Sequence, residues 1–334
     1  HTRFKCDWSS DVCSSDLTIF GVHVKKSAAP VWHADAAFYE ITDKHNQAIG
    51  QFYLDLYARN NKRGGAWMDE AITRRKHGNN QVTTPVAYLT CNFSAPVGDK
   101  PALFTHDEVI TMFHEFGHGL HHMLTQVEDY GVSGIKGVEW DAVELPSQFM
   151  ENFCWEWDVI RHMTKHVDTG EALPRNLFDK MIAAKNFQAG MQTVRQIEFS
   201  LFDMRLHGDF DPSGKLTALD LIEQVRDEVA VVRPPKWNRF PHGFTHIFAG
   251  GYAAGYYSYK WAELLSADAW SAFEEEGVFN AATGQRFLTE VLEQGGARDA
   301  IDNFKAFRGR RSEEHTSELQ SHLNLVCRLL LEKK

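Results

Sequence analysis

The sequence predicts a mainly α-helical protein with a small β element, and three observations lead to that fold class. Hydrophobic residues make up 43% of the 334 residues and charged residues 24%, which is typical of a globular chain with a sizeable core. From residue 105 onward, apolar residues recur mostly at helical intervals. A β-branched and aromatic stretch at residues 82–93 favours a strand instead.

Two segments precede the first predicted helix. Residues 48–59 mix apolar and polar positions, so their pattern does not decide between strand and helix. Residues 82–93 are predicted to form a strand, because Val, Thr, Tyr and Phe are frequent in them and a proline lies near their start.

The next segment carries the strongest helix signals in the chain. Thr105 and Glu108 have the spacing of a capping box, which predicts that a helix begins just after Thr105. Its expected apolar positions are Val109, Met112, Phe113, Phe116, Leu120 and Met123. Later helices are predicted at residues 144–166, 175–208, 216–230, 252–276 and 284–294, and turn residues separate them.

The two ends of the chain differ in composition from the rest. The first residue is His rather than Met, so we expect a fragment or a processed product. Residues 1–17 repeat a Ser-Ser-Asp element without periodicity, and the composition changes abruptly after Arg310. We predict that residues 1–17 and 311–334 are non-native, adapter-like extensions around a domain at 18–310. The alternative for residues 311–334 is an amphipathic helix.

Composition excludes several classes of partner. The net charge is −10 and no Lys/Arg cluster occurs, so we expect no nucleic acid. No apolar run approaches 18 residues and no secretory signal is visible, so we expect no membrane association and a cytoplasmic location. The five cysteines are widely spread without CxxC spacing, which favours reduced thiols over disulfides.

The predicted helix after Thr105 contains the motif HExxH, formed by His114, Glu115 and His118. Residues four apart lie on one face of a helix, so both imidazoles can reach one metal ion while Glu115 projects beside it. This arrangement is typical of zinc hydrolases. The alternative is a pair of core histidines, and the motif alone does not exclude it. His121 and His122 follow on the same helix and are expected to be bystanders.

A catalytic zinc needs a third protein ligand. The metzincin continuation fails, because His121 and Leu124 occupy its Gly and His positions. Four carboxylates downstream of the motif have suitable spacing. They are Glu139, Asp141, Glu144 and Glu151, and spacing alone does not choose among them.

Three tyrosines lie close together near the C-terminal end. Tyr252, Tyr256 and Tyr259 are spaced i, i+4 and i+7, so on the predicted helix 252–276 their hydroxyls would share one face. An aromatic core stripe is the alternative explanation. His246 lies just before them and four residues after His242, but no Glu follows His242, so a second metal site is not expected.

Several motifs together resemble the thimet oligopeptidase family of zinc metallopeptidases. They are HEFGHGLHHML, VSG, DAVELPSQFMENF, HIFAGGYAAGYYSY, FYLDLYARNNKRGGAWMDE and PVAYLTCNF, and the resemblance runs through residues 19–310. It implies one zinc ion (Zn2+) held by His114, His118 and Glu144, with Glu115 as the catalytic carboxylate. Asp141 would orient a ligand imidazole.

The resemblance also implies an activity and an architecture. His246, Tyr252, Tyr256 and Tyr259 would bind substrate or stabilise the transition state. The chain would be a helical, zincin-type catalytic domain, a fragment of a two-domain channel-like oligopeptidase that is a monomeric metalloendopeptidase on short peptides. The alternatives are a peptidyl-dipeptidase (dipeptidyl carboxypeptidase) of the same family and an inactive peptide-binding module. The strand near 86–93 is a candidate for pairing with an extended peptide, and the alternative is a strand internal to the sheet.

Overall fold

The structure, a computed structural model, describes residues 19–312. This part of the chain forms two compact units. The first comprises residues 19–139, 145–182 and 266–312, and the second comprises residues 140–144 and 183–265. The predicted extension 1–17 and nearly all of 311–334 lie outside the described residues, so the domain boundaries stay predictions.

The first unit is built on a five-stranded sheet with strand order β1-β2-β3-β7-β4. β3 and β7 are parallel, and the other neighbouring strands are antiparallel. The strands are β1 (His23–Ser27), β2 (Ala37–Thr42), β3 (Ala48–Tyr57), β4 (Trp67–Ile72) and β7 (Val86–Phe93), beside the short pair β5 (Arg75–Lys76) and β6 (Val82–Thr83). The undecided segment 48–59 is therefore a strand, and 82–93 divides into two strands rather than one.

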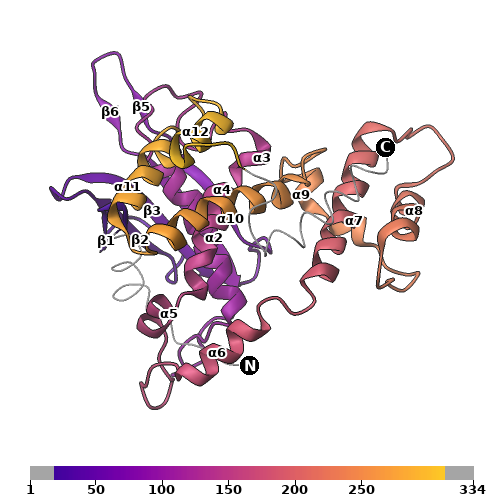
Figure 1. Cartoon of the computed structure of the whole chain (residues 1–334), viewed down its shortest axis with the longest axis horizontal. Coiled ribbons are helices and arrows are strands. Elements are labelled where there is room, and N and C mark those ends of the chain that lie inside the picture. Colours follow the sequence, from indigo (N-terminus) through magenta and orange to yellow (C-terminus); the bar gives the residue numbers. More distant parts are fainter. Residues whose placement is uncertain (1–18, 313–334) are drawn as a thin grey trace. The chain divides into compact units, whose positions relative to one another are not determined.

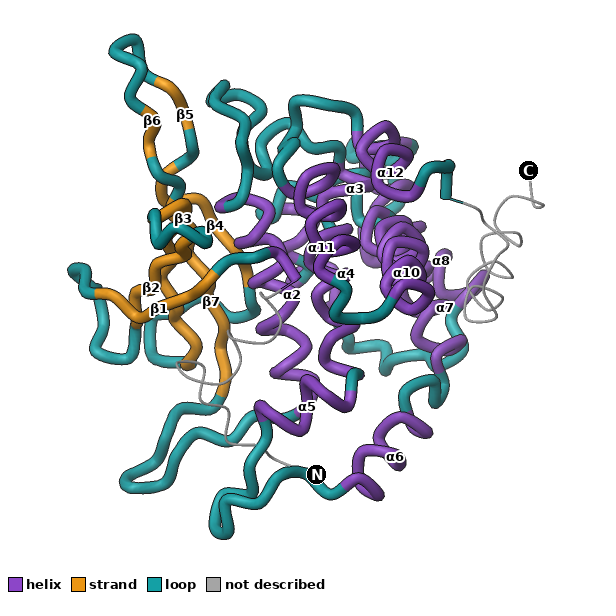
Figure 2. Tube along the Cα trace, turned by 60° about the vertical axis from the view of Figure 1, so that its left-hand side comes forward, coloured by secondary structure: helices purple, strands orange, loops and turns teal. Residues whose placement is uncertain are grey.

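Helix α2 (His106–Met123) packs against this sheet and begins where the sequence predicts. The Thr105 hydroxyl accepts a hydrogen bond from the Glu108 amide at 3.2 Å, and Glu108 accepts one from the Thr105 amide at 2.7 Å. This capping box is confirmed, and all six predicted apolar positions are buried. Figure 2 shows α2 to one side of the strands, together with helices α4 and α11.

Other helical segments complete the first unit. They are α4 (Leu145–Glu151), η3 (Asn152–Trp155), α5 (Trp157–Met163), most of α6 (Arg175–Ala184), α11 (Ala281–Phe287), the π-helical turn η5 (Leu288–Leu292) and α12 (Ala300–Arg308). Of these, α4, η3 and η5 pack against α2. Helix α10 (Ser258–Glu276) begins in the second unit and continues into the first (Figure 1).

The second unit has its own core. It contains α3 (Trp140–Val143), α7 (Ala189–Gly208), α8 (Ala218–Val229), η4 (Phe240–Gly243) and α9 (Thr245–Phe248). Apolar residues of α7, α8, η4 and α9 pack together, including Phe202 and Val225, which are fully buried. A buried ion pair joins α7 to α8, with Glu198 and Arg226 at 2.9 Å.

Several predicted helices are interrupted. Residues 144–166 divide into α4, η3 and α5, and 175–208 breaks at Gln188, which has a left-handed φ of 56°. The prediction for 252–276 is wrong at its start, because residues 253–257 form turns and α10 begins at Ser258. Ala254 is left-handed there with a φ of 55°, a conformation that a right-handed helix does not contain. The predicted fold class, mainly helical with a small β element, is confirmed.

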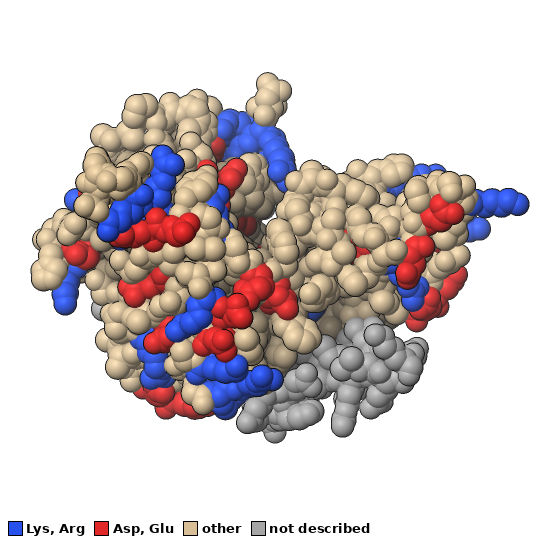
Figure 3. Space-filling model, turned by 90° about the horizontal axis from the view of Figure 1, so that it is seen from above, with Lys and Arg blue, Asp and Glu red and all other residues tan. Residues whose placement is uncertain are grey.

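None of the helices between residues 19 and 312 is long and apolar enough to cross a membrane. On the face drawn in Figure 3, basic and acidic side chains are interspersed over the described residues.

Candidate metal centre

Helix α2 places both histidines of the HExxH motif on one side. The rings of His114 and His118 lie 5.0 Å apart between centroids, as expected for residues one turn apart. Both side chains are partly exposed, whereas Glu115 between them is 6% exposed. The opposite face of α2 is buried in the core, so the packing of the helix fixes the direction in which the two imidazoles project.

The approach of α4 to α2 brings in the third residue. A Cβ atom at Gly117 would lie 2.5 Å from the Pro146 carbonyl oxygen, so the two helices touch backbone to backbone at this point. Glu144 is bonded to Leu145, the first residue of α4, so this packing also carries Glu144 to α2. One ligand atom each from His114, His118 and Glu144 lies within 4.8 Å of the others.

Two other carboxylates of the predicted set, Glu139 and Glu151, have partners elsewhere. Glu139 accepts hydrogen bonds from the Ala300 amide at 3.0 and 3.3 Å, at the start of α12. Glu151 accepts one from His114 Nδ1 at 2.6 Å. For His114, the orienting role expected of Asp141 therefore belongs to Glu151. The sequence contains a signal for this role: Glu151 is a carboxylate at the end of the short helix that follows Glu144.

This donor set fits zinc. Two imidazoles and one carboxylate are a common ligand set of catalytic zinc, and a ligand histidine usually donates its second ring nitrogen to a carboxylate. The His114–Glu151 hydrogen bond fixes the tautomer and the orientation that suit coordination through Nε2. Within the described residues, no other group of three His, Cys, Asp or Glu side chains has metal-binding spacing.

We expect Glu151→Gln to weaken zinc binding about 10- to 100-fold, because the amide is a poorer acceptor for His114 Nδ1. Competition with a chromogenic chelator measures the affinity. Asp158→Asn is the matched control, since Asp158 pairs with Arg161 at the surface and the change should leave the affinity unchanged. Equal affinities of the Glu151 variant and the unaltered chain would contradict this role.

The tyrosine loop, residues 250–257, leads from α9 to α10. A Cβ atom at Gly250 would lie 2.9 Å from the His246 carbonyl oxygen, and Gly251 has a φ of 86°. These two glycines allow a tight turn that presents Tyr252 to Trp140, with ring centroids 4.6 Å apart. The Tyr252 hydroxyl donates a hydrogen bond to Glu144.

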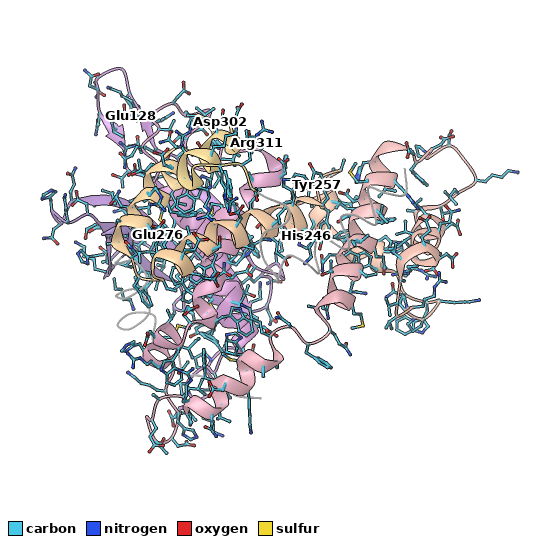
Figure 4. All side chains as sticks on the ribbon, in the orientation of Figure 1. Glu128, His246, Tyr257, Glu276, Asp302 and Arg311 are labelled. Atoms are coloured by element: carbon cyan, nitrogen blue, oxygen red, sulfur yellow. The ribbon has the colours of Figure 1, made fainter. Side chains whose placement is uncertain are left out.

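The predicted tyrosines and His246 cluster by this turn rather than along one helix. Tyr252 stacks on Tyr259 at 4.9 Å, and Tyr259 lies 5.1 Å from Tyr256 and 6.1 Å from His246. Figure 4 shows His246, which precedes the loop, and Tyr257, the last residue of the loop, in the same region of the structure. The four residues thus form one chain of ring contacts, and Tyr252 connects this chain to Glu144 by a hydrogen bond.

Burial raises the pKa of two tyrosines of this cluster, Tyr252 and Tyr256. It raises the pKa of Tyr256 to about 12, and the Tyr256 hydroxyl donates to Gln196 at 3.0 Å. Burial and the nearby Glu144 carboxylate also raise the pKa of Tyr252. Both hydroxyls are therefore hydrogen-bond donors at neutral pH. By contrast, burial lowers the pKa of His121 to about 3, so this imidazole is neutral.

Comparison with known proteins identifies the family. The model of Peptidase family M3 matches residues 13–325, which is nearly the whole chain. The chain belongs to peptidase family M3. The resemblance to the thimet oligopeptidase family is confirmed. The chain is also highly similar to oligopeptidase A.

Relatives within family M3 cover a similar part of the chain. Oligopeptidase A of Escherichia coli (strain K12) is 59% identical over 87% of this chain, and dipeptidyl carboxypeptidase of Salmonella typhimurium is 35% identical over 87%. The chain spans 43% and 42% of the lengths of these two relatives. The solved structure of PZ peptidase A with inhibitor 2 shares the fold, with a TM-score of 0.51 and 16% identity over 84% of this chain and 43% of that chain.

Proposed function

We propose that this M3 peptidase is a zinc-dependent metalloendopeptidase that hydrolyses peptide bonds in short oligopeptides. The observation that carries the proposal is the convergence of His114, His118 and Glu144, with Glu151 orienting His114. Membership of family M3 supports the reaction class, and 59% identity to a protein named oligopeptidase A supports the substrate class.

The residues of the site have distinct roles in this mechanism. When bound by His114, His118 and Glu144, zinc would acidify a water molecule and polarise the scissile carbonyl. Glu115 accepts a proton from the attacking water and passes it to the leaving amine. To donate to the developing oxyanion, the Tyr252 and Tyr256 hydroxyls would turn from Glu144 and Gln196, and His246 and Tyr259 are the further donors of this group. Burial raises the pKa of Tyr256 to about 12, so its hydroxyl is a donor at neutral pH.

Strand addition by an extended peptide needs a free strand edge. Of the two alternatives for residues 86–93, the internal strand is the one found, because β7 lies between β3 and β4 and pairs with both. β4 is an edge strand of the sheet and packs against α2. We therefore propose that an extended peptide would pair with β4 (Trp67–Ile72) rather than with β7.

The alternative within the family is removal of C-terminal dipeptides, since the chain is also 35% identical to a dipeptidyl carboxypeptidase. A peptide of about ten residues with a free or an amidated C-terminus separates the two reactions. We expect cleavage of both peptides at the same internal bonds and at rates within about twofold, since an endopeptidase needs no terminal carboxylate. Cleavage of the free-acid peptide alone would establish the dipeptidyl carboxypeptidase, and cleavage of neither would favour a peptide-binding module.

A monomeric state, a cytoplasmic location and the absence of nucleic-acid and membrane partners stay predictions. Short peptides are the proposed partners of the site.

A further inference from the structure

A buried carboxylate of α7 holds the tyrosine loop. Asp203 is fully buried, and its two oxygens accept three hydrogen bonds. Oδ1 accepts from the Ala254 amide at 2.9 Å and from His207 Nδ1 at 2.8 Å, and Oδ2 accepts from the Tyr256 amide at 2.9 Å. Hydrogen bonds to an ionised acceptor are stronger than those between neutral groups. Asp203 is therefore well placed to fix the backbone of residues 254–256.

The loop needs an external support of this kind. Ala254 adopts a left-handed φ of 55°, which is disfavoured for a residue with a Cβ atom. The amides of Ala254 and Tyr256 bond to Asp203, whereas the intervening Gly255 amide bonds within the loop to the Tyr252 carbonyl. The residue with the disfavoured conformation, Ala254, is thus one that the Asp203 carboxylate binds.

A second side chain of α7 acts on the same loop. Gln196 lies seven residues before Asp203, two helical turns away and on the same face. Its side-chain oxygen accepts the Tyr256 hydroxyl at 3.0 Å. One face of α7 therefore fixes both the backbone and a hydroxyl of the loop.

We propose that Asp203 is a positioning residue, which holds the tyrosine loop so that Tyr252 reaches Glu144 and Tyr256 keeps its orientation. This inference rests on the proposed function for its catalytic consequence. The hydrogen bonds of Asp203 go to the loop and to His207 of its own helix. The joining of α7 to α8 depends instead on the apolar core and on the Glu198–Arg226 pair. Loss of the carboxylate should therefore loosen the loop more than the unit.

Amide hydrogen exchange tests the loop directly. In the unaltered chain, we expect the Ala254 and Tyr256 amides to be protected at least about 100-fold relative to an unstructured peptide. Asp203→Asn should raise their exchange at least about tenfold, because Asn retains one acceptor oxygen but adds a donor group that faces these amides. Glu198→Gln is the matched control. Glu198 is a buried carboxylate of the same helix that accepts a hydrogen bond from Arg226, so its replacement should leave loop exchange unchanged.

Unprotected amides in the unaltered chain would overturn the inference, whether or not the variant folds. Equal loop exchange in Asp203→Asn and in the unaltered chain would also overturn it. So would an equal rise in the Glu198→Gln control, because the effect would then be general.

Kinetics of the zinc-loaded chain tests the catalytic consequence. We expect Asp203→Asn to lower kcat at least about tenfold with KM within about threefold, because misplaced donors weaken the transition state more than substrate binding. Unchanged kcat together with faster loop exchange would contradict the catalytic part of the inference. If the unaltered chain cleaves no peptide, the proposed function fails, whereas the exchange comparison still decides whether Asp203 holds the loop.

Discussion

Glu115→Gln should leave zinc binding intact and lower kcat for peptide hydrolysis by about three orders of magnitude. The amide of Gln cannot accept the proton of the attacking water, whereas His114, His118 and Glu144 remain in place to hold the metal. The side chains have nearly the same shape, so a position 6% exposed on α2 should tolerate the change. Zinc analysis and initial rates on one preparation measure both effects.

Asp107→Asn is the matched control for this variant. It makes the same carboxylate-to-amide change on α2, at an exposed first-turn position away from the motif, and should leave kcat unchanged. A Glu115→Gln variant with full zinc content and the turnover of the unaltered chain would show that another group transfers the proton.

Gly117→Ala should have the largest effect on stability of any single methyl group near the site. Its Cβ atom would lie 2.5 Å from the Pro146 carbonyl oxygen and 2.6 Å from Ser147 Cα, and both are backbone atoms of α4. We expect the free energy of unfolding to fall by about 3 kcal/mol. Zinc affinity should fall as well, because Glu144 directly precedes α4 and moves with it. Urea unfolding and chelator competition measure the two effects.

Gly119→Ala, two residues further along the same helix, is the matched control. Its Cβ atom would lie 3.0 Å from Leu89 Cδ2, the end of a side chain that can move slightly. Alanine also favours helix over glycine by about 1 kcal/mol, so this variant should have nearly unchanged stability. Equal urea midpoints for both variants would mean that the contact of α2 with α4 is not tight.

The sequence predicts local structure well where one signal dominates. The capping box at Thr105 and the apolar spacing along α2 gave the start and the buried face of this helix. The HExxH spacing then placed His114 and His118 on one side, because helix geometry relates residues four apart without reference to the rest of the fold.

Other features depend on contacts between distant segments. Spacing left four carboxylates open as the third ligand, and the packing of Gly117 on Pro146 is what brings Glu144 to α2. The tyrosines suggested a helix face, but the left-handed Ala254 forms a turn that depends on Asp203, 51 residues earlier. A buried acid within an amphipathic helix has no pattern that reveals this partner.

Strands at the sheet edges were also missed. β4, with the sequence WMDEAI, is half-exposed and does not alternate cleanly between apolar and polar residues. Its pairing with β7 joins two distant segments, so no local turn signal marks it.

The zinc content of the purified, dialysed chain, measured beside Glu144→Ala, tests the central claim most directly. We predict about one zinc ion per chain in the unaltered protein and a loss of most of it in the variant, because a catalytic site with two remaining protein ligands binds the metal weakly. Elemental analysis after dialysis against metal-free buffer measures both. Little zinc in the folded, unaltered chain, or equal zinc in the variant, would contradict a site formed by His114, His118 and Glu144.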